Sequence, residues 1–187
     1  QLLALLARRS GDSTAAVGYL DRISALDPLS HFARFERFRL VPTGRNRDDF
    51  LGMIRSELPH ESFLELAAVY MRTGLHEEAC LILSLASRHP MVDLWQGYCL
   101  AKTGRQGESK HHLDLALGAS PALVFPHRRE DWDVLRWADA RARNWKISYY
   151  LALLSWSLGR TRDAEVSFAA CGDTCSFAPL YLARAGF

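Results

Sequence analysis

The sequence predicts an all-α chain of stacked antiparallel helical hairpins, and three regularities indicate this fold class. Prolines recur every 31 residues, at Pro28, Pro59, Pro90 and Pro121. Glycines precede these prolines by 17, 15, 16 and 17 residues, at Gly11, Gly44, Gly74 and Gly104. Between these positions apolar residues recur at offsets of 3 and 4, as on one face of a helix. A fixed period of roughly 20 to 50 residues is typical of repeat proteins, in which each hairpin buries its apolar face against the next.

The first two repeats cover residues 1–58. We expect residues 1–10 to form a helix, and residues 11–28 to form a second helix with its apolar face at Ala16, Leu20 and Ile23. Residues 29–58 are a degenerate repeat. Its first helix carries Phe32, Phe35 and Phe38, and Asp48 or Asp49 is expected to cap the second.

The repeat from Pro59 to Pro90 has the clearest pattern. Its first helix carries an apolar stripe of Phe63, Leu66, Ala67 and Tyr70, Gly74 ends that helix, and a second helix carries Ala79, Leu83 and Ala86 up to Pro90. In the next repeat Gly97 takes the place of Ala67, and Leu113 and Ala116 follow. A glycine inside a helix costs about 1 kcal/mol relative to alanine, so Gly97 predicts a close contact with another helix.

The regular spacing is lost after Pro121, and residues 121–144 are the second degenerate segment. We expect a loop over residues 121–128 and an additional helix with one face at Trp132, Leu135 and Ala138. The pattern then returns in a last hairpin, with Tyr149, Ala152 and Trp156 before Gly159, and Ala164 and Phe168 after it. Residues 177–185 are expected to start one more helix.

These residues resemble a tetratricopeptide repeat array. Its pattern of large, small and aromatic residues is met by Phe63, Leu66, Ala67, Tyr70, Gly74, Ala79, Leu83, Ala86 and Pro90. The resemblance implies a right-handed α-solenoid of about six hairpins, with about 11 to 12 helices, in a single domain over residues 1–187.

The resemblance also implies a function, because ligands in that family lie along the concave surface made by the first helix of each hairpin. The same register places an apolar and aromatic lane edged with cations on that surface: Leu64, Ala68, Met71, Arg72, Leu94, Tyr98, Lys102, Lys146, Tyr149, Leu153 and Trp156. Such a lane favours a protein or peptide partner with apolar anchors and acidic character. The alternative is that these residues pack on an adjoining domain of the same chain. Leu64 and Ala68 stand where the family's carboxylate clamp needs Lys and Asn, so we do not expect that activity.

Parts of the sequence also resemble the C-terminal repeat region of large bacterial proteins with an uncharacterised, carbohydrate-related N-terminal domain. This resemblance, and a first residue that is Gln rather than Met, lead us to expect a fragment of a longer protein. The alternative function is therefore an accessory or oligomerisation domain of a larger bacterial carbohydrate-processing enzyme.

Composition argues against several kinds of partner. The 23 Lys and Arg residues are mixed with 21 Asp and Glu residues, which favours solvated helix faces over a nucleic-acid patch. A nucleic-acid-linked module that uses the arginines remains a second rival. No apolar run approaches the roughly 18 to 20 residues that a membrane span needs, and we expect a cytoplasmic chain.

Residue patterns predict no enzyme, no cofactor and no metal. Phosphate-binding loops, nucleophile elbows and zinc-binding helix motifs are missing from the sequence. His111 and His112 are adjacent, so they point about 100° apart on a helix. Cys80 and Cys99 fall in apolar stretches, as small hydrophobes do. Cys171 and Cys175 are open to three interpretations: half a metal site, a local disulfide or unpaired thiols, of which we favour the last.

Overall fold

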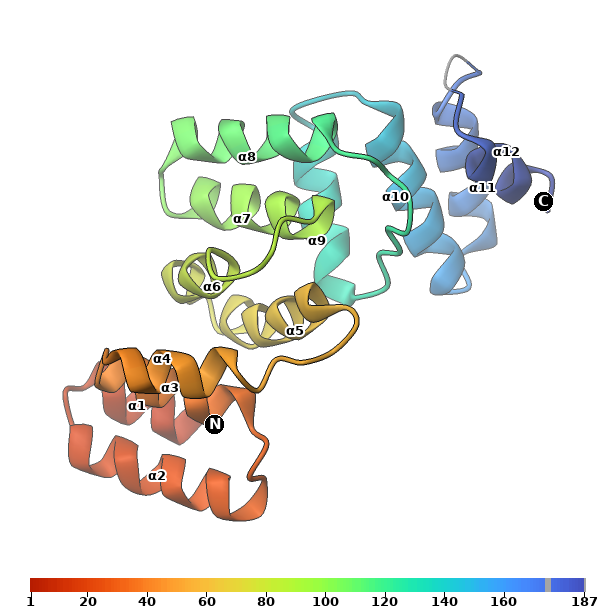
Figure 1. Cartoon of the computed structure of the whole chain (residues 1–187). Coiled ribbons are helices and arrows are strands. Elements are labelled where there is room, and N and C mark those ends of the chain that lie inside the picture. Colours follow the sequence, from red (N-terminus) through yellow and green to blue (C-terminus); the bar gives the residue numbers. More distant parts are fainter. Residues whose placement is uncertain (174–175, 187) are drawn as a thin grey trace. The chain divides into compact units, whose positions relative to one another are not determined.

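The computed structural model describes residues 1–173 and 176–186, which form helices and the segments between them (Figure 1). Twelve helices and no strand are present in these residues, so the all-α prediction is confirmed. The chain divides into two compact units, Gln1–Ser62 and Phe63–Phe187, and each is described by itself.

The N-terminal unit contains two helical hairpins. They are formed by α1 (Leu2–Arg9), α2 (Ser13–Leu26), α3 (His31–Leu40) and α4 (Gly44–Leu51). Successive helices pack on one another. Gly11 adopts a φ of +81° between α1 and α2, which is a helix-ending conformation that glycine reaches without a steric penalty. The core is made of apolar side chains from all four helices: Leu5, Ala16, Leu20, Phe32, Phe35 and Phe50.

An ion pair lies at the edge of this core. Arg8 Nε of α1 donates to Glu36 Oε2 of α3 at 2.7 Å. The Glu36 side chain is only 1% exposed, so the guanidinium compensates a carboxylate that has lost most of its water.

The start of α4 differs from its prediction. Thr43 caps this helix, because its Oγ1 accepts from the amide of Asn46 at 3.3 Å. Asp48 and Asp49 lie inside the helix instead of capping it. Gly44 shares the spacing of Gly11, Gly74 and Gly104, but it is the first residue of α4 and has no positive φ.

The C-terminal unit contains most of the helices. They are α5 (Pro59–Arg72), α6 (His76–Leu83), α7 (Pro90–Lys102), α8 (Gln106–Gly118), α9 (Arg129–Asp139), α10 (Trp145–Ser157), α11 (Thr161–Ala170) and α12 (Ala178–Arg184). Helix α7 packs against α6, α8 and α9, and α10 packs against α9 and α11. The additional helix of the degenerate segment therefore joins the α7/α8 hairpin to the α10/α11 hairpin.

Glycines end the first helix of three hairpins in this unit, as the spacing predicts. Gly74, Gly104 and Gly159 have φ values of +72°, +83° and +71°. The second helix of the first hairpin is shorter than expected, because α6 ends at Leu83 and Ala86 lies beyond it. Pro90 is the first residue of α7, where its missing amide hydrogen costs nothing.

Gly97 lies at a close helix contact, which confirms its prediction. A Cβ atom at this position would lie 2.9 Å from the ring of Trp137 and 3.1 Å from the carbonyl oxygen of Ser109. The Ser109 hydroxyl donates to the Gly97 carbonyl at 2.8 Å. The absent side chain thus lets α8 and α9 both approach the backbone of α7.

Helix α9 buries Leu135 and Ala138 as predicted, but Trp132 remains partly exposed. The residue before it, Asp131, is buried instead. Its carboxylate accepts from the amides of His127 and Arg128 at 2.9 and 2.8 Å, so this acidic residue satisfies free amides at the start of α9.

Candidate binding surface

Three of the residues predicted to line a binding groove are core residues. Leu64, Leu94 and Tyr149 are 1%, 0% and 4% exposed. The Tyr149 ring lies against those of Phe168 and Phe177, with centroids 6.3 and 5.4 Å away. These three side chains pack between helices and do not face a groove, because neighbouring helices cover the positions that they occupy on α5, α7 and α10. Ala68 is buried in the same way.

Lys146 has a structural role in place of the predicted one. Its Nζ donates to the carbonyl oxygens of Leu117 and Ala119 at 2.7 and 2.6 Å. These carbonyls lie at the C-terminal end of α8, where a cation satisfies unpaired acceptors and the helix dipole. Partial burial lowers the pKa of Lys146.

Three predicted residues, Met71, Arg72 and Tyr98, do come together. They line a cavity of about 190 Å³ with residues of α6 and α9. The complete lining is Met71, Arg72, His76, Tyr98, Arg129, Glu130 and Asp133. We call this cavity the Tyr98 cleft.

Aromatic and cationic groups surround Tyr98. Lys102, a fourth predicted residue, places its Nζ 5.2 Å from the centre of the Tyr98 ring. His76 and Trp137 approach the same ring edge-on, with centroids 6.1 and 6.0 Å away. Burial and the charge of Lys102 lower the pKa of His76, which favours its neutral form. Tyr98 is thus held in place by its neighbours while part of its ring stays accessible.

Charges around the cleft are only partly paired. Arg72 donates to Glu130, and this hydrogen bond raises the pKa of Arg72. Arg129 and Lys102 are exposed cations, and Asp133 is an exposed acid. Arg72 pairs with Glu130, whereas Arg129 and Lys102 at the rim form no ion pair with any residue that the structure describes.

The last two predicted residues, Leu153 and Trp156, line a separate apolar cavity of about 500 Å³. They share it with Phe125, Pro126, His127 and Ser157. Phe125 is 62% exposed and Trp156 is 46% exposed. The segment before α9 presents Phe125 in this way because its neighbour Val124 is buried and anchors the chain.

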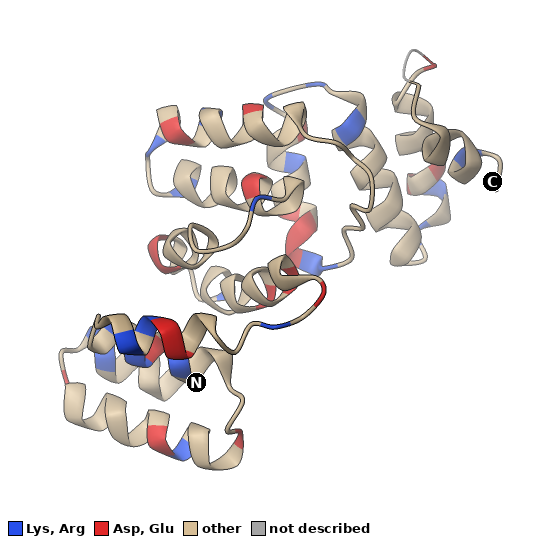
Figure 2. Ribbon diagram, viewed as in Figure 1, with Lys and Arg blue, Asp and Glu red and all other residues tan. Residues whose placement is uncertain are grey.

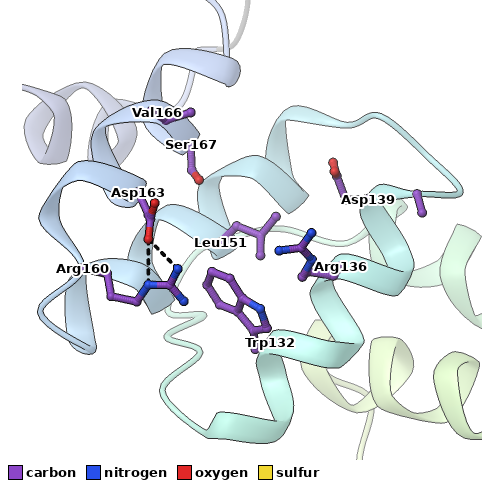
Figure 3. A pocket seen from close by; sticks show the side chains of 9 residues that line it. Trp132, Arg136, Asp139, Leu151, Arg160, Asp163, Val166 and Ser167 are labelled. Carbon is purple, nitrogen blue, oxygen red and sulfur yellow. Dashed lines mark hydrogen bonds and ion pairs between the residues drawn. The ribbon is translucent and has the colours of Figure 1, made fainter.

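A third pocket lies over α10 between residues of α9 and α11 (Figure 3). Its volume is about 390 Å³, and Leu151 is its residue from α10. The guanidinium of Arg160 lies 4.4 Å from the centre of the Trp132 ring and also pairs with Asp163 at 2.6 Å. Arg136 lies 5.8 Å from the same ring. The acids Asp139 and Asp163 balance the two arginines in this pocket, so it has no strong preference for an anion.

The sequence analysis did not predict that α9 lines the Tyr98 cleft and the pocket over α10. Arg129, Glu130 and Asp133 complete the Tyr98 cleft, but α9 belongs to a segment that departs from the repeat pattern. The sequence does contain one signal for the pocket over α10. Trp132 and Arg136 are one turn apart on an amphipathic helix, a spacing at which a cation can lie over an aromatic ring.

Acidic and basic residues share the same helices, including α4 and α9 (Figure 2). Within residues 1–173 and 176–186, no group of three or more His, Cys, Asp and Glu side chains is placed to hold a metal ion. Cys175 lies outside the described residues, so its relation to Cys171 is not described. Across the same residues, every helix is too short or too polar to cross a bilayer.

Comparison with known proteins gives no assignment: no family model matches the chain, and no curated protein matches it.

Proposed function

We propose that the C-terminal unit is a non-catalytic interaction module that binds a peptide segment of a partner protein at the Tyr98 cleft. The observation that carries this proposal is the position of Tyr98, an accessible aromatic ring flanked by Lys102 and Met71 beside a small cavity. Aromatic residues held rigid by their neighbours contribute strongly to binding, because they lose little conformational entropy when a ligand arrives.

The residues in and around the Tyr98 cleft indicate which side chains the bound peptide would carry. The cavity has room for one side chain, which would contact Met71 and the Tyr98 ring. The cations Lys102 and Arg129 outnumber the exposed acid Asp133 and favour acidic residues beside that side chain. We therefore propose a segment with an aliphatic or aromatic anchor flanked by Asp or Glu. We also infer a tetratricopeptide-like right-handed stacking of hairpins within residues 63–173, supported by the equivalent turns at Gly74, Gly104 and Gly159.

Selection from a phage-displayed library of random 12-residue peptides tests this proposal. We expect enriched peptides to carry the anchor with acidic neighbours. The double variant Y98A/K102A should weaken their binding about tenfold or more, measured by fluorescence anisotropy with the labelled peptides. The matched control is K110A, which removes an exposed lysine of α8 that pairs with Asp114. Circular dichroism checks that both variants keep their helicity.

Two results would contradict the proposal. One is a selection that enriches no common motif on the wild-type chain. The other is a set of enriched peptides that bind Y98A/K102A as tightly as the wild type, which would place the binding surface elsewhere.

The apolar cavity favours a second candidate function, an accessory or oligomerisation domain. Phe125 and Trp156 expose large apolar side chains to the same cavity, which is unusual for a monomeric surface. If this function holds, light scattering after size exclusion should find a dimer that F125S/W156S converts to a monomer. The control L182S changes an apolar residue that is 74% exposed and lies outside the cavity. A monomeric wild-type chain would argue against self-association.

A further inference from the structure

The pocket over α10 contains two oppositely charged side chains that do not pair. Arg136 and Asp139 both belong to α9, and both line this pocket. Neither forms an ion pair with a residue that the structure describes. Residues three apart on a helix are neighbours on its surface, with Cβ atoms roughly 5 to 6 Å apart. Helix α9 thus presents a cation and an anion side by side, and each can bind a charged group of a ligand.

The other two charges of the pocket neutralise each other. Arg160 donates from Nε to Asp163 Oδ2 at 2.7 Å, and its Nη2 lies 2.6 Å from the same oxygen. The indole of Trp132 lies between the guanidinium groups of Arg160 and Arg136 (Figure 3). Both groups are oriented by the ring, but the charge of Arg160 is already balanced. Arg136 therefore keeps its charge for a ligand.

Aliphatic side chains line the rest of the pocket. Leu151 of α10 lies between the α9 side and the α11 side (Figure 3). Ala140 and Val166 line the pocket as well, and Val166 is 66% exposed. The volume of about 390 Å³ falls within the roughly 300 to 1,000 Å³ of small-molecule sites. The pocket thus combines an aliphatic surface with one available cation and one available anion.

We propose that this pocket binds a free α-amino acid with an aliphatic side chain, such as leucine. Its carboxylate accepts from the guanidinium of Arg136, and its ammonium group donates to the carboxylate of Asp139. Its side chain packs on Leu151 and Val166. An α-amino acid carries both charges on one carbon atom, which matches two opposite charges one turn apart on a helix. The site shares no residue with the Tyr98 cleft, so it goes beyond the proposed peptide binding.

Other small ligands fit the pocket less well. An anion such as phosphate would meet Arg136, but also the carboxylates of Asp139 and Asp163. A simple cation would meet the guanidinium groups of Arg136 and Arg160. An uncharged apolar molecule would remove water from Arg136 and Asp139 without pairing either charge, which costs free energy. A ligand with both charges avoids all three penalties.

Titration of the full chain with L-leucine, followed in ¹H–¹⁵N correlation NMR spectra, tests this proposal. Amide signals of α9, α10 and α11 should shift and give a dissociation constant. Loss of either ligand charge should weaken binding about tenfold. The probes are 3-methylbutylamine, which lacks the carboxylate, and 4-methylpentanoate, which lacks the ammonium group. N-acetyl-L-leucinamide lacks both charges and should bind more weakly still.

Two variants connect each ligand charge with its residue. R136Q should weaken the binding of leucine about tenfold without weakening that of 3-methylbutylamine, which has no carboxylate to lose. D139N should weaken the binding of leucine by a similar factor without weakening that of 4-methylpentanoate. The matched controls are R162Q and E165Q, which change exposed residues of α11 outside the pocket and should bind leucine like the wild type.

Three results would overturn the inference. The first is a wild-type spectrum that leucine leaves unchanged up to the limit of its solubility. The second is equal affinity for leucine and N-acetyl-L-leucinamide, which would indicate a surface for apolar groups alone. The third is a variant, R136Q or D139N, that binds leucine as tightly as the controls do. Because the ligand series is measured on the wild-type chain, misfolding of a variant would not obscure the result.

Discussion

The indole Nε1 of Trp95 donates a hydrogen bond to Asp131 Oδ1 at 2.8 Å, and both residues are buried. This bond joins the middle of α7 to the first turn of α9. With the amides of His127 and Arg128, it gives the carboxylate three donors in the interior of the C-terminal unit. A helix from the irregular segment is thereby attached to a regular hairpin through one acidic side chain.

Replacing Trp95 by Phe should lower the free energy of unfolding by about 2 kcal/mol, because the carboxylate loses a donor and the smaller ring leaves a void. Urea denaturation followed by circular dichroism measures the loss. The control is W145F, since Trp145 is partly exposed and its ring contacts are with Phe177 and Lys146. Equal loss in the two variants would contradict a special role for the Trp95 bond.

Stability should depend on pH through Asp131. Burial raises the pKa of Asp131 above its ordinary value of 3.8, against the opposing effect of its hydrogen bonds. Between the unfolded and folded pKa values the folded state binds more protons than the unfolded state, so stability falls as pH rises through this window. Relative to D131N, which cannot titrate, the wild type should lose stability as pH rises above about 4. Urea titrations at several pH values give this difference, and a constant difference would refute the prediction.

The G97A substitution should destabilise the C-terminal unit by about 1 to 3 kcal/mol, although alanine is the better helix former. The added methyl group would meet the Trp137 ring and the Ser109 carbonyl, and a backbone carbonyl yields little. G107A provides the control, because nothing lies within 4 Å of a Cβ there and helix propensity should act alone. A gain in thermal stability for G97A would mean that α8 and α9 move apart easily.

The R8M substitution should destabilise the N-terminal unit by about 3 kcal/mol, because it removes the Arg8 guanidinium from the buried Glu36 carboxylate. The double variant R8M/E36M should recover much of this loss, since both charged groups are then replaced by apolar ones. Thermal and urea unfolding of the two variants give the comparison. A double variant no more stable than R8M would show that the cost lies in packing and not in the lost ion pair between Arg8 and Glu36.

Much of the fold is predictable from the sequence, because the signals are local. Gly11, Gly74, Gly104 and Gly159 end helices through a backbone conformation that other residues rarely adopt. Gly44 meets the same spacing without that conformation, since Thr43 and its hydroxyl define the helix start there. Spacing alone does not distinguish a turn glycine from one at a helix start.

The candidate site is less predictable, because it depends on which faces the neighbouring helices cover. Leu64 and Leu94 occupy the same side of the repeat pattern as Met71 and Tyr98, yet only the latter two reach the Tyr98 cleft. The cleft also needs Arg129 and Glu130 from α9, whose position follows from the long-range bond between Trp95 and Asp131. The repeat pattern does not predict that bond, because α9 lies in a segment that departs from the pattern.

The stacking of Arg160 on Trp132 has a mechanical consequence for the C-terminal end of the chain. Trp132 belongs to α9, Arg160 precedes α11, and both helices pack on α10. Local unfolding that begins at α12 should therefore stop near Arg160, because its guanidinium stacks on the indole of Trp132. Amide hydrogens of α12 should exchange with deuterium well before those of α10.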